Sequence, residues 1–204
     1  MNKGYKIIRT NQINTSTWSG GKVLELLTYP QNADSDAQNF LFEVSSATVD
    51  LEKSNFTLYP NHDRIIMTLD NKLELVHNNS EKIVLNKFEP YVFDGAAHTV
   101  SYGKVRDFNL IMRKNQCYGD AIALSINRNS IIYPRKAIPT FKNNIELVYC
   151  VSGSLIFKPK DKKHIINAGD LLIIKHNFFG KDYFYTNDDN ELCNIIISMI
   201  MFND

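Results

Sequence analysis

Leu69-Asp70-Asn71-Lys72-Leu73-Glu74-Leu75 and Val151-Ser152-Gly153-Ser154-Leu155-Ile156-Phe157 are two copies of one pattern, a polar turn followed by an apolar strand. The two copies are 82 residues apart: Gly153 in the second copy corresponds to Asn71 in the first. The same offset pairs Ile83-Val84 with Ile165-Ile166, and Tyr91-Val92 with Ile173-Ile174. Each copy predicts a β-meander of four strands joined by a tight turn, a polar loop and a second turn. Two similar halves predict an all-β chain folded as a duplicated barrel or sandwich.

The composition is that of an ordinary globular protein. The 204 residues are 44% apolar and 22% charged, and the formal net charge is +1. Without a basic field, neither nucleic acid nor an anionic membrane is an expected partner. No apolar run is long enough to span a membrane, and the N-terminus lacks the apolar segment of a signal peptide. Three cysteines, an odd number without metal-ligand spacing, favour a reducing, cytoplasmic location.

Short runs rich in β-branched and aromatic residues, bounded by turn residues, occur along the whole chain. The expected strands are Tyr5–Ile8, Lys22–Tyr29, Phe40–Val49, Asp63–Leu69, Lys72–His77, Glu81–Leu85, Tyr91–Phe93, Thr99–Tyr102, Val105–Arg113, Tyr118–Ser125, Ile145–Val151, Leu155–Lys158, Lys163–Ile166, Leu171–His176 and Leu192–Phe202. A short helix near Asp34–Gln38 would also fit. The stretch Gln116–Asn144 is expected to lead into the second half. We therefore predict two jelly-roll-like barrels, at residues 1–115 and 116–204.

The strand Val105–Arg113 alternates between an apolar and a mixed face. Phe108, Leu110 and Met112 form the apolar face, which belongs to the core. The other face carries Asp107, Asn109, Ile111 and then Arg113. Turned inward, these residues would give an acceptor, an amide and a guanidinium that orient a small polar molecule. Turned outward, they would be ordinary polar residues of an edge strand.

Trp18-Ser19-Gly20-Gly21 contains the single tryptophan of the chain beside two glycines. Glycines let the backbone approach a ligand closely and present its N–H groups, and Trp18 would supply a flat apolar wall. The same residues would equally serve as a turn entering a strand, with the tryptophan closing one end of a barrel. Both interpretations stay open at this point.

Charged residues on the expected strands also allow two interpretations. Glu25 lies in a strand with apolar neighbours, so it is expected to bind a ligand or to pair with Arg64 or Arg113. Asp63 and Arg64 follow a Pro-Asn turn, where they either fix the loop or reach a carboxylate. Of the five histidines, none stands two residues from another, and His62 comes nearest to a metal site if folding brings it to Glu25. We expect neither a metal nor another cofactor.

Four segments, in order, resemble the HutD/Ves family of bacterial bicupins. They are Trp18-Ser19-Gly20-Gly21-Lys22-Val23-Leu24-Glu25, Ser45-Ser46-Ala47, Phe56-Thr57-Leu58-Tyr59-Pro60-Asn61-His62-Asp63-Arg64 and Asp107-Phe108-Asn109-Leu110-Ile111-Met112-Arg113. The resemblance covers roughly the first 115 residues closely. It implies two cupin barrels, a bacterial cytosolic protein without confirmed catalytic activity, and a link to histidine utilisation or to stress response.

This sequence departs from the family pattern at three positions. Val23 stands where many relatives have Thr, Glu43 where relatives often have Arg, and Asn61 where they have a turn glycine. Replacing Arg by Glu reverses a charge and disfavours a carboxylate ligand there. If the Thr and the Arg of relatives hold an anionic ligand, the loss of both argues against carrying the identity of that ligand over to this chain.

We expect a metal-free bicupin that binds a small polar metabolite in its N-terminal barrel and acts as a sensor or modulator. The expected ligand-binding residues are Trp18, Gly20, Gly21, Glu25, His62, Arg64, Asp107, Asn109 and Arg113. One alternative is a metal-independent enzyme acting on a small polar acid, with Glu25 or His62 as general base. Another is a scaffold without a ligand, forming a homodimer through the apolar strand Asn194–Phe202.

Overall fold

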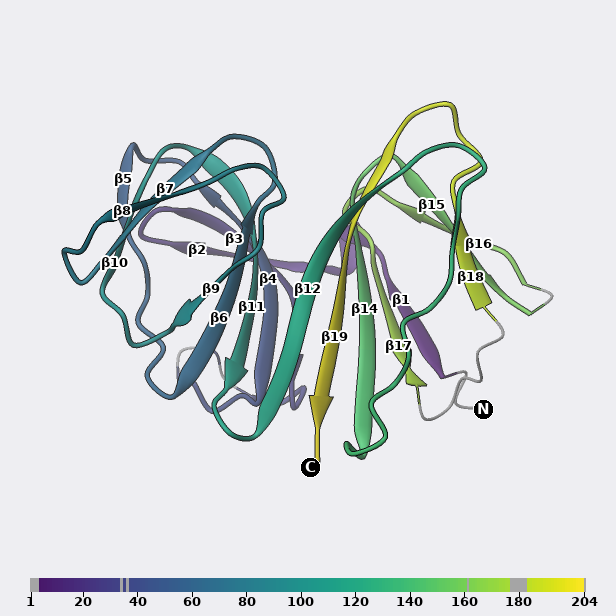
Figure 1. Cartoon of the computed structure of the whole chain (residues 1–204), viewed down its shortest axis with the longest axis horizontal. Coiled ribbons are helices and arrows are strands. Elements are labelled where there is room, and N and C mark those ends of the chain that lie inside the picture. Colours follow the sequence, from purple (N-terminus) through teal and green to yellow (C-terminus); the bar gives the residue numbers. More distant parts are fainter. Residues whose placement is uncertain (1–3, 34, 36, 161, 177–182, 204) are drawn as a thin grey trace. The chain divides into compact units, whose positions relative to one another are not determined.

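The computed structural model describes residues 4–33, 35, 37–160, 162–176 and 183–203, which form β-strands and connecting turns (Figure 1). The described part contains no α-helix, and the 3-10 turn η1 (Thr10–Gln12) follows the first strand. Nothing in it has the length and apolar character of a membrane-crossing helix. The expected helix at Asp34–Gln38 includes residues 34 and 36, which lie outside the described residues.

The chain divides into two compact units, each described by itself below. One comprises Ile13–Tyr118 and is called the first barrel; the other comprises Met1–Gln12 with Gly119–Asp204 and is called the second barrel. The division differs from the expected ranges in the first twelve residues, which cluster with the C-terminal part of the chain. The physical reason is strand pairing, because β1 (Tyr5–Ile8) pairs with β17 (Leu171–Lys175).

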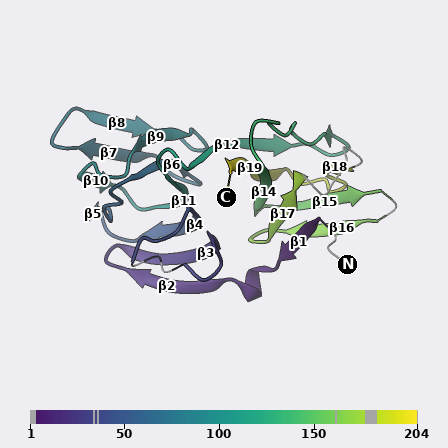
Figure 2. The ribbon, with the colours of Figure 1, turned by 90° about the horizontal axis from the view of Figure 1, so that it is seen from below.

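Two sheets enclose the core of the first barrel. Its strands are β2 (Asn14–Trp18), β3 (Gly21–Tyr29), β4 (Phe42–Val49), β5 (Lys53–Asn55), β6 (His62–Thr68), β7 (Leu73–His77), β8 (Lys82–Leu85), β9 (Tyr91–Asp94), β10 (Thr99–Tyr102) and β11 (Val105–Arg113). Six run in the order β2-β3-β4-β11-β6-β9, and four in the order β5-β10-β7-β8 (Figure 2). Val49, Ile66 and Val105 from the larger sheet pack with Leu73 and Leu75 from the smaller one.

The second barrel repeats this plan. Its other strands are β12 (Cys117–Ile126), β13 (Ile131–Ile132), β14 (Asn143–Ser152), β15 (Ser154–Pro159), β16 (His164–Asn167), β18 (Tyr183–Thr186) and β19 (Cys193–Phe202). The sheet orders are β1-β17-β14-β19-β12 and β13-β18-β15-β16. The strands β6 to β9 and β14 to β17 thus occupy equivalent places, as the sequence repeat predicts. The predicted meander is wrong, because β6 pairs with β9 while β7 pairs with β8, in a different sheet.

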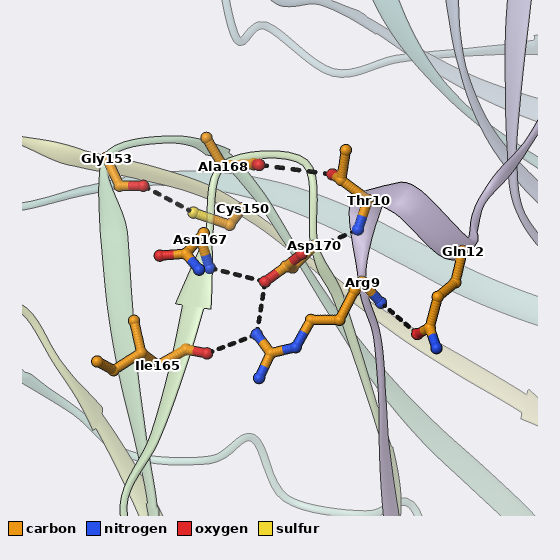
Figure 3. A network of polar contacts seen from close by, with 9 residues as sticks. All are labelled: Arg9, Thr10, Gln12, Cys150, Gly153, Ile165, Asn167, Ala168 and Asp170. Atoms are coloured by element: carbon orange, nitrogen blue, oxygen red, sulfur yellow. Dashed lines mark hydrogen bonds and ion pairs between the residues drawn. The ribbon is translucent and has the colours of Figure 1, made fainter.

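A polar network fixes the N-terminal segment to the second barrel (Figure 3). Arg9 Nη1 donates to Asp170 Oδ2 at 2.7 Å and to the Ile165 carbonyl at 2.7 Å. The Thr10 amide donates to Asp170 Oδ1 at 3.0 Å. Gly169 adjoins this contact with φ +88°, and a Cβ there would lie 2.0 Å from Thr10 Oγ1. The N-terminal segment therefore packs against a turn in which position 169 must be glycine.

The strand β19 is an interior strand of its sheet, with β14 on one side and β12 on the other. Its side chains are buried except for the half-buried Asn194. The expected dimer surface at Asn194–Phe202 is therefore wrong for this strand, because its apolar side chains and its backbone are already used within the chain. A homodimer through another surface stays a prediction.

Candidate functional site

A cavity of about 100 Å³ lies inside the first barrel. It is lined by Trp18, Val23, Glu43, Ser45, Ala47, Phe56, Thr57, Tyr59, Arg64, Asp107, Asn109 and Ile111. Four of the expected site residues, Trp18, Arg64, Asp107 and Asn109, are among them. An apolar cavity of 150 Å³ in another protein accepts benzene, so this space suits a molecule of a few heavy atoms.

The register of the larger sheet explains why these side chains meet. On β11, Asn109 lies opposite Ser45 of β4 and Ile66 of β6. Two residues further along β11, Ile111 lies opposite Glu43 of β4 and Arg64 of β6. Side chains of directly opposed residues point to the same face, so the mixed face of β11 continues across three strands. Of the two placements that the sequence left open, the structure shows the inward one for Asp107, Asn109 and Ile111, which line the cavity.

Arg64 is the central cation of the cavity and is only 6% exposed. Its Nη2 donates to Asn109 Oδ1 at 2.8 Å, and Nη1 donates to the Thr57 carbonyl at 3.3 Å. The rings of Phe56, Tyr59 and Phe93 lie 5.0 to 5.4 Å from the guanidinium carbon. Burial lowers the pKa of Arg64, and the nearby Tyr59, Asp107 and Glu43 oppose that shift.

One polar atom of Arg64 has no partner: its buried Nε forms no hydrogen bond with the protein. An unsatisfied buried donor costs about 1–3 kcal/mol, and more in a charged group. Arg64 lines the cavity, so a molecule in the cavity that carries an acceptor would lie beside this guanidinium.

Asp107 is held beside Arg64 by its own neighbours. Its Oδ1 accepts from Asn109 Nδ2 at 2.7 Å and from the Ala47 amide at 3.3 Å. The side chain is 2% exposed, and burial raises its pKa to about 7, with Arg64 and the two hydrogen bonds opposing the shift. Near neutral pH this carboxyl group therefore exists in both protonation states.

Glu43 is a cavity residue that the sequence analysis did not assign to the site. It is 5% exposed on β4, and Ser35 Oγ donates to its Oε2. The signal for it was present, because Glu43 shares a strand face with Ser45 and Ala47, both family-like positions. Alternation along β4 would have placed all three inward once Asn109 was placed inward.

The two glycines support the cavity wall without lining it. A Cβ on Gly20 would lie 2.3 Å from the Trp18 ring, and one on Gly21 would lie 2.2 Å from the Thr48 carbonyl oxygen. The indole of Trp18 donates to that carbonyl at 3.1 Å. The glycines thus let the Trp18 ring and β4 approach closely. This role corresponds to the structural interpretation of the motif.

Glu25, His62 and Arg113 are not brought to the cavity. His62 is buried between the Phe40 and Tyr59 rings, with Nδ1 3.0 Å from the Pro60 carbonyl oxygen. Arg113 donates to the carbonyls of Phe40 and Gln38 at 3.0 and 2.7 Å.

Glu25 is half-buried on β3, opposite Asn14 and Ser45. Within the described residues, no ion pair joins Glu25 to Arg64 or Arg113, so the expected structural pairing is wrong. Among those residues, no three His, Cys, Asp or Glu side chains gather in a way that could hold a metal ion.

The position equivalent to Arg64 in the second barrel carries the opposite charge. Glu146 stands 82 residues after Arg64 and is fully buried. It accepts hydrogen bonds from Tyr185 Oη and, at 3.0 Å, from the Arg135 amide. His176 Nε2 lies 3.5 Å from its Oε2. Because both carboxylate oxygens of Glu146 are bonded within the barrel, the duplicated position is structural there.

The fold of two cupin-type barrels in one chain is that of a bicupin, and comparison with known proteins agrees. The sequence profile of the HutD family matches residues 10–190, so the chain belongs to the HutD family. Among curated proteins, no sequence match was found.

Three solved structures share the whole fold. The conserved protein PA5104 from Pseudomonas aeruginosa PAO1 is 17% identical with a TM-score of 0.79, and the match covers 97% of this chain and 98% of that chain. HutD from Pseudomonas fluorescens SBW25 is 18% identical with a TM-score of 0.72, covering 98% and 100%. YhhW from Escherichia coli is 7% identical with a TM-score of 0.70, covering 96% and 97%. At these identities the likeness shows the fold alone.

Proposed function

We propose that the protein binds a small polar metabolite in the cavity of the first barrel and serves as a sensor or modulator. The observation that carries this proposal is the buried guanidinium of Arg64, which lines the cavity and uses only some of its five N–H groups on the protein. An acceptor on a bound molecule would pair with this guanidinium, and the apolar walls formed by Trp18 and Phe56 would cover the rest of that molecule. The family's link to histidine utilisation suggests a metabolite from amino-acid breakdown.

The enzyme alternative loses its expected general bases, because Glu25 and His62 lie outside the cavity wall. It would now rest on Asp107, whose pKa of about 7 suits proton transfer near neutrality. Asp107 is also the acceptor for Asn109 and Ala47, which gives it a structural role without catalysis. Chemical change of the bound molecule during incubation would favour the enzyme over the sensor.

Native mass spectrometry of protein purified from its own host tests the binding proposal. We expect one small molecule per chain, released and identified after denaturation. The variant Ala47→Leu is the control, since it adds bulk to the cavity wall without changing a charge, and it should be isolated empty. An empty wild-type protein, or equal occupancy in the folded Ala47→Leu variant, would contradict a ligand in this cavity.

A further inference from the structure

The cavity wall combines charges of both signs. Arg64, Glu43 and Asp107 are 6%, 5% and 2% exposed, and all three line the same space. Water screens charges poorly in such a buried place, so a ligand is selected by the sum of these charges. One guanidinium faces one carboxylate and a second carboxyl group that exchanges its proton near neutrality.

Summed over the described residues that line the cavity, the charges leave no net positive charge to attract an anion. With Asp107 protonated, Arg64 and Glu43 balance; with Asp107 ionised, the wall carries one net negative charge. A monoanion would therefore make the buried site more negative in either state. A neutral or zwitterionic molecule would leave the sum unchanged, so its electrostatic penalty on binding is smaller.

We propose that the cavity selects a neutral or zwitterionic molecule with an acceptor for Arg64 and an N–H donor for Glu43, and that it rejects a carboxylate anion of equal size. This inference rests on the proposed function and adds the ligand class. Glu43 is the specificity-determining residue in this assignment, because a positive residue at that position would reverse the choice. A primary amide is a small group that contains both the carbonyl acceptor for Arg64 and the N–H donor for Glu43.

Acetamide and acetate test the inference, because they have nearly the same shape and differ in charge and in the donor. Trp18, the single tryptophan, lines the cavity, so its fluorescence reports binding directly. We expect acetamide to bind the wild-type protein at least about tenfold more tightly than acetate at pH 8, where Asp107 is mostly ionised.

The variant Glu43→Gln removes one negative charge at nearly constant shape. At pH 6, where Asp107 is mostly protonated, the wall of this variant carries one net positive charge, and the order should reverse in favour of acetate. Glu52→Gln makes the same charge change at a side chain that is 81% exposed, and it should leave the order unchanged. The wild-type comparison stands without either variant, so a folding defect in Glu43→Gln does not remove the test.

These experiments distinguish failure of the inferred ligand class from failure of the proposed binding function. Tighter binding of acetate than of acetamide, abolished by Ala47→Leu, would overturn the ligand class and leave the cavity as a binding site. Absence of any response of Trp18 to either compound, together with an empty protein from the host, would overturn the proposed function itself. Equal affinities for the two compounds would also contradict the inference, because the charges of the wall would then have no influence.

Discussion

The variant Arg64→Met is expected to bind acetamide about 100-fold more weakly than the wild-type protein, a difference of about 3 kcal/mol. The reason is the loss of the buried guanidinium that lines the cavity and has N–H groups left for a ligand. Methionine keeps much of the chain length of arginine and suits the surrounding rings of Phe56 and Phe93, so the barrel should stay folded. Trp18 fluorescence measures the affinity.

Arg106→Met is the matched control on the neighbouring strand β11. Its side chain is 47% exposed and lies 3.5 Å from Asp70, outside the cavity lining. It removes the same charge from the same barrel, and we expect less than a twofold change in affinity. Equal effects of the two variants would show that the net charge of the barrel, and not the buried Arg64, determines binding.

The variant Asp107→Asn is expected to make the protein more stable at pH 8 by up to about 4 kcal/mol, with little effect near pH 4. Burial raises the pKa of Asp107 from 3.8 in the unfolded chain to about 7 in the folded one. Between these values the folded state binds the extra proton, so stability falls as pH rises and the full penalty applies above pH 7. Asparagine cannot ionise and retains an oxygen for the Ala47 amide.

Urea unfolding of both proteins at pH 4, 6 and 8 measures the difference. The charges that act on Asp107 are those of Arg64, which lowers its pKa, and of Asp70, which raises it. Glu43 lines the same cavity. Asp50→Asn, at an exposed position of the same barrel, should show no such pH dependence. A difference that is the same at pH 4 and pH 8 would mean that Asp107 stays ionised when buried.

Most strands could be predicted because their own residues alternate. The strand at Val105–Arg113 is found at the predicted bounds, and its mixed face lines the cavity. Four strands were missed. One of them, β18 (Tyr183–Thr186), is a short aromatic and mostly buried run that was not recognised as a strand. The other three have little signal of their own: β2 has mostly polar and exposed residues, β5 has three residues and β13 has two. Such strands form by hydrogen bonding to a neighbour already in place, which local pattern does not reveal.

The site was predicted in part, for a similar reason. Asp107 and Asn109 stood out within one strand, whereas Glu43 enters the site through its register with Ile111. The pairing of distant strands also explains why the first strand joins the second barrel. His62 and Arg113 lie on the strand faces that point toward the cavity, yet their side chains bond to the backbone carbonyls of Pro60 and Phe40. Strand alternation predicts the face of a residue but not its depth in the barrel.

The most direct test of a ligand at Arg64 is the NMR signal of its Nε–H group. The signal is assigned by its absence in Arg64→Lys and followed while acetamide, or the molecule released from the host protein, is added. The account predicts a large shift of this signal that saturates together with the Trp18 fluorescence, because the guanidinium of Arg64 gains an acceptor. A saturating Trp18 response with an unmoved Arg64 Nε–H signal would contradict it.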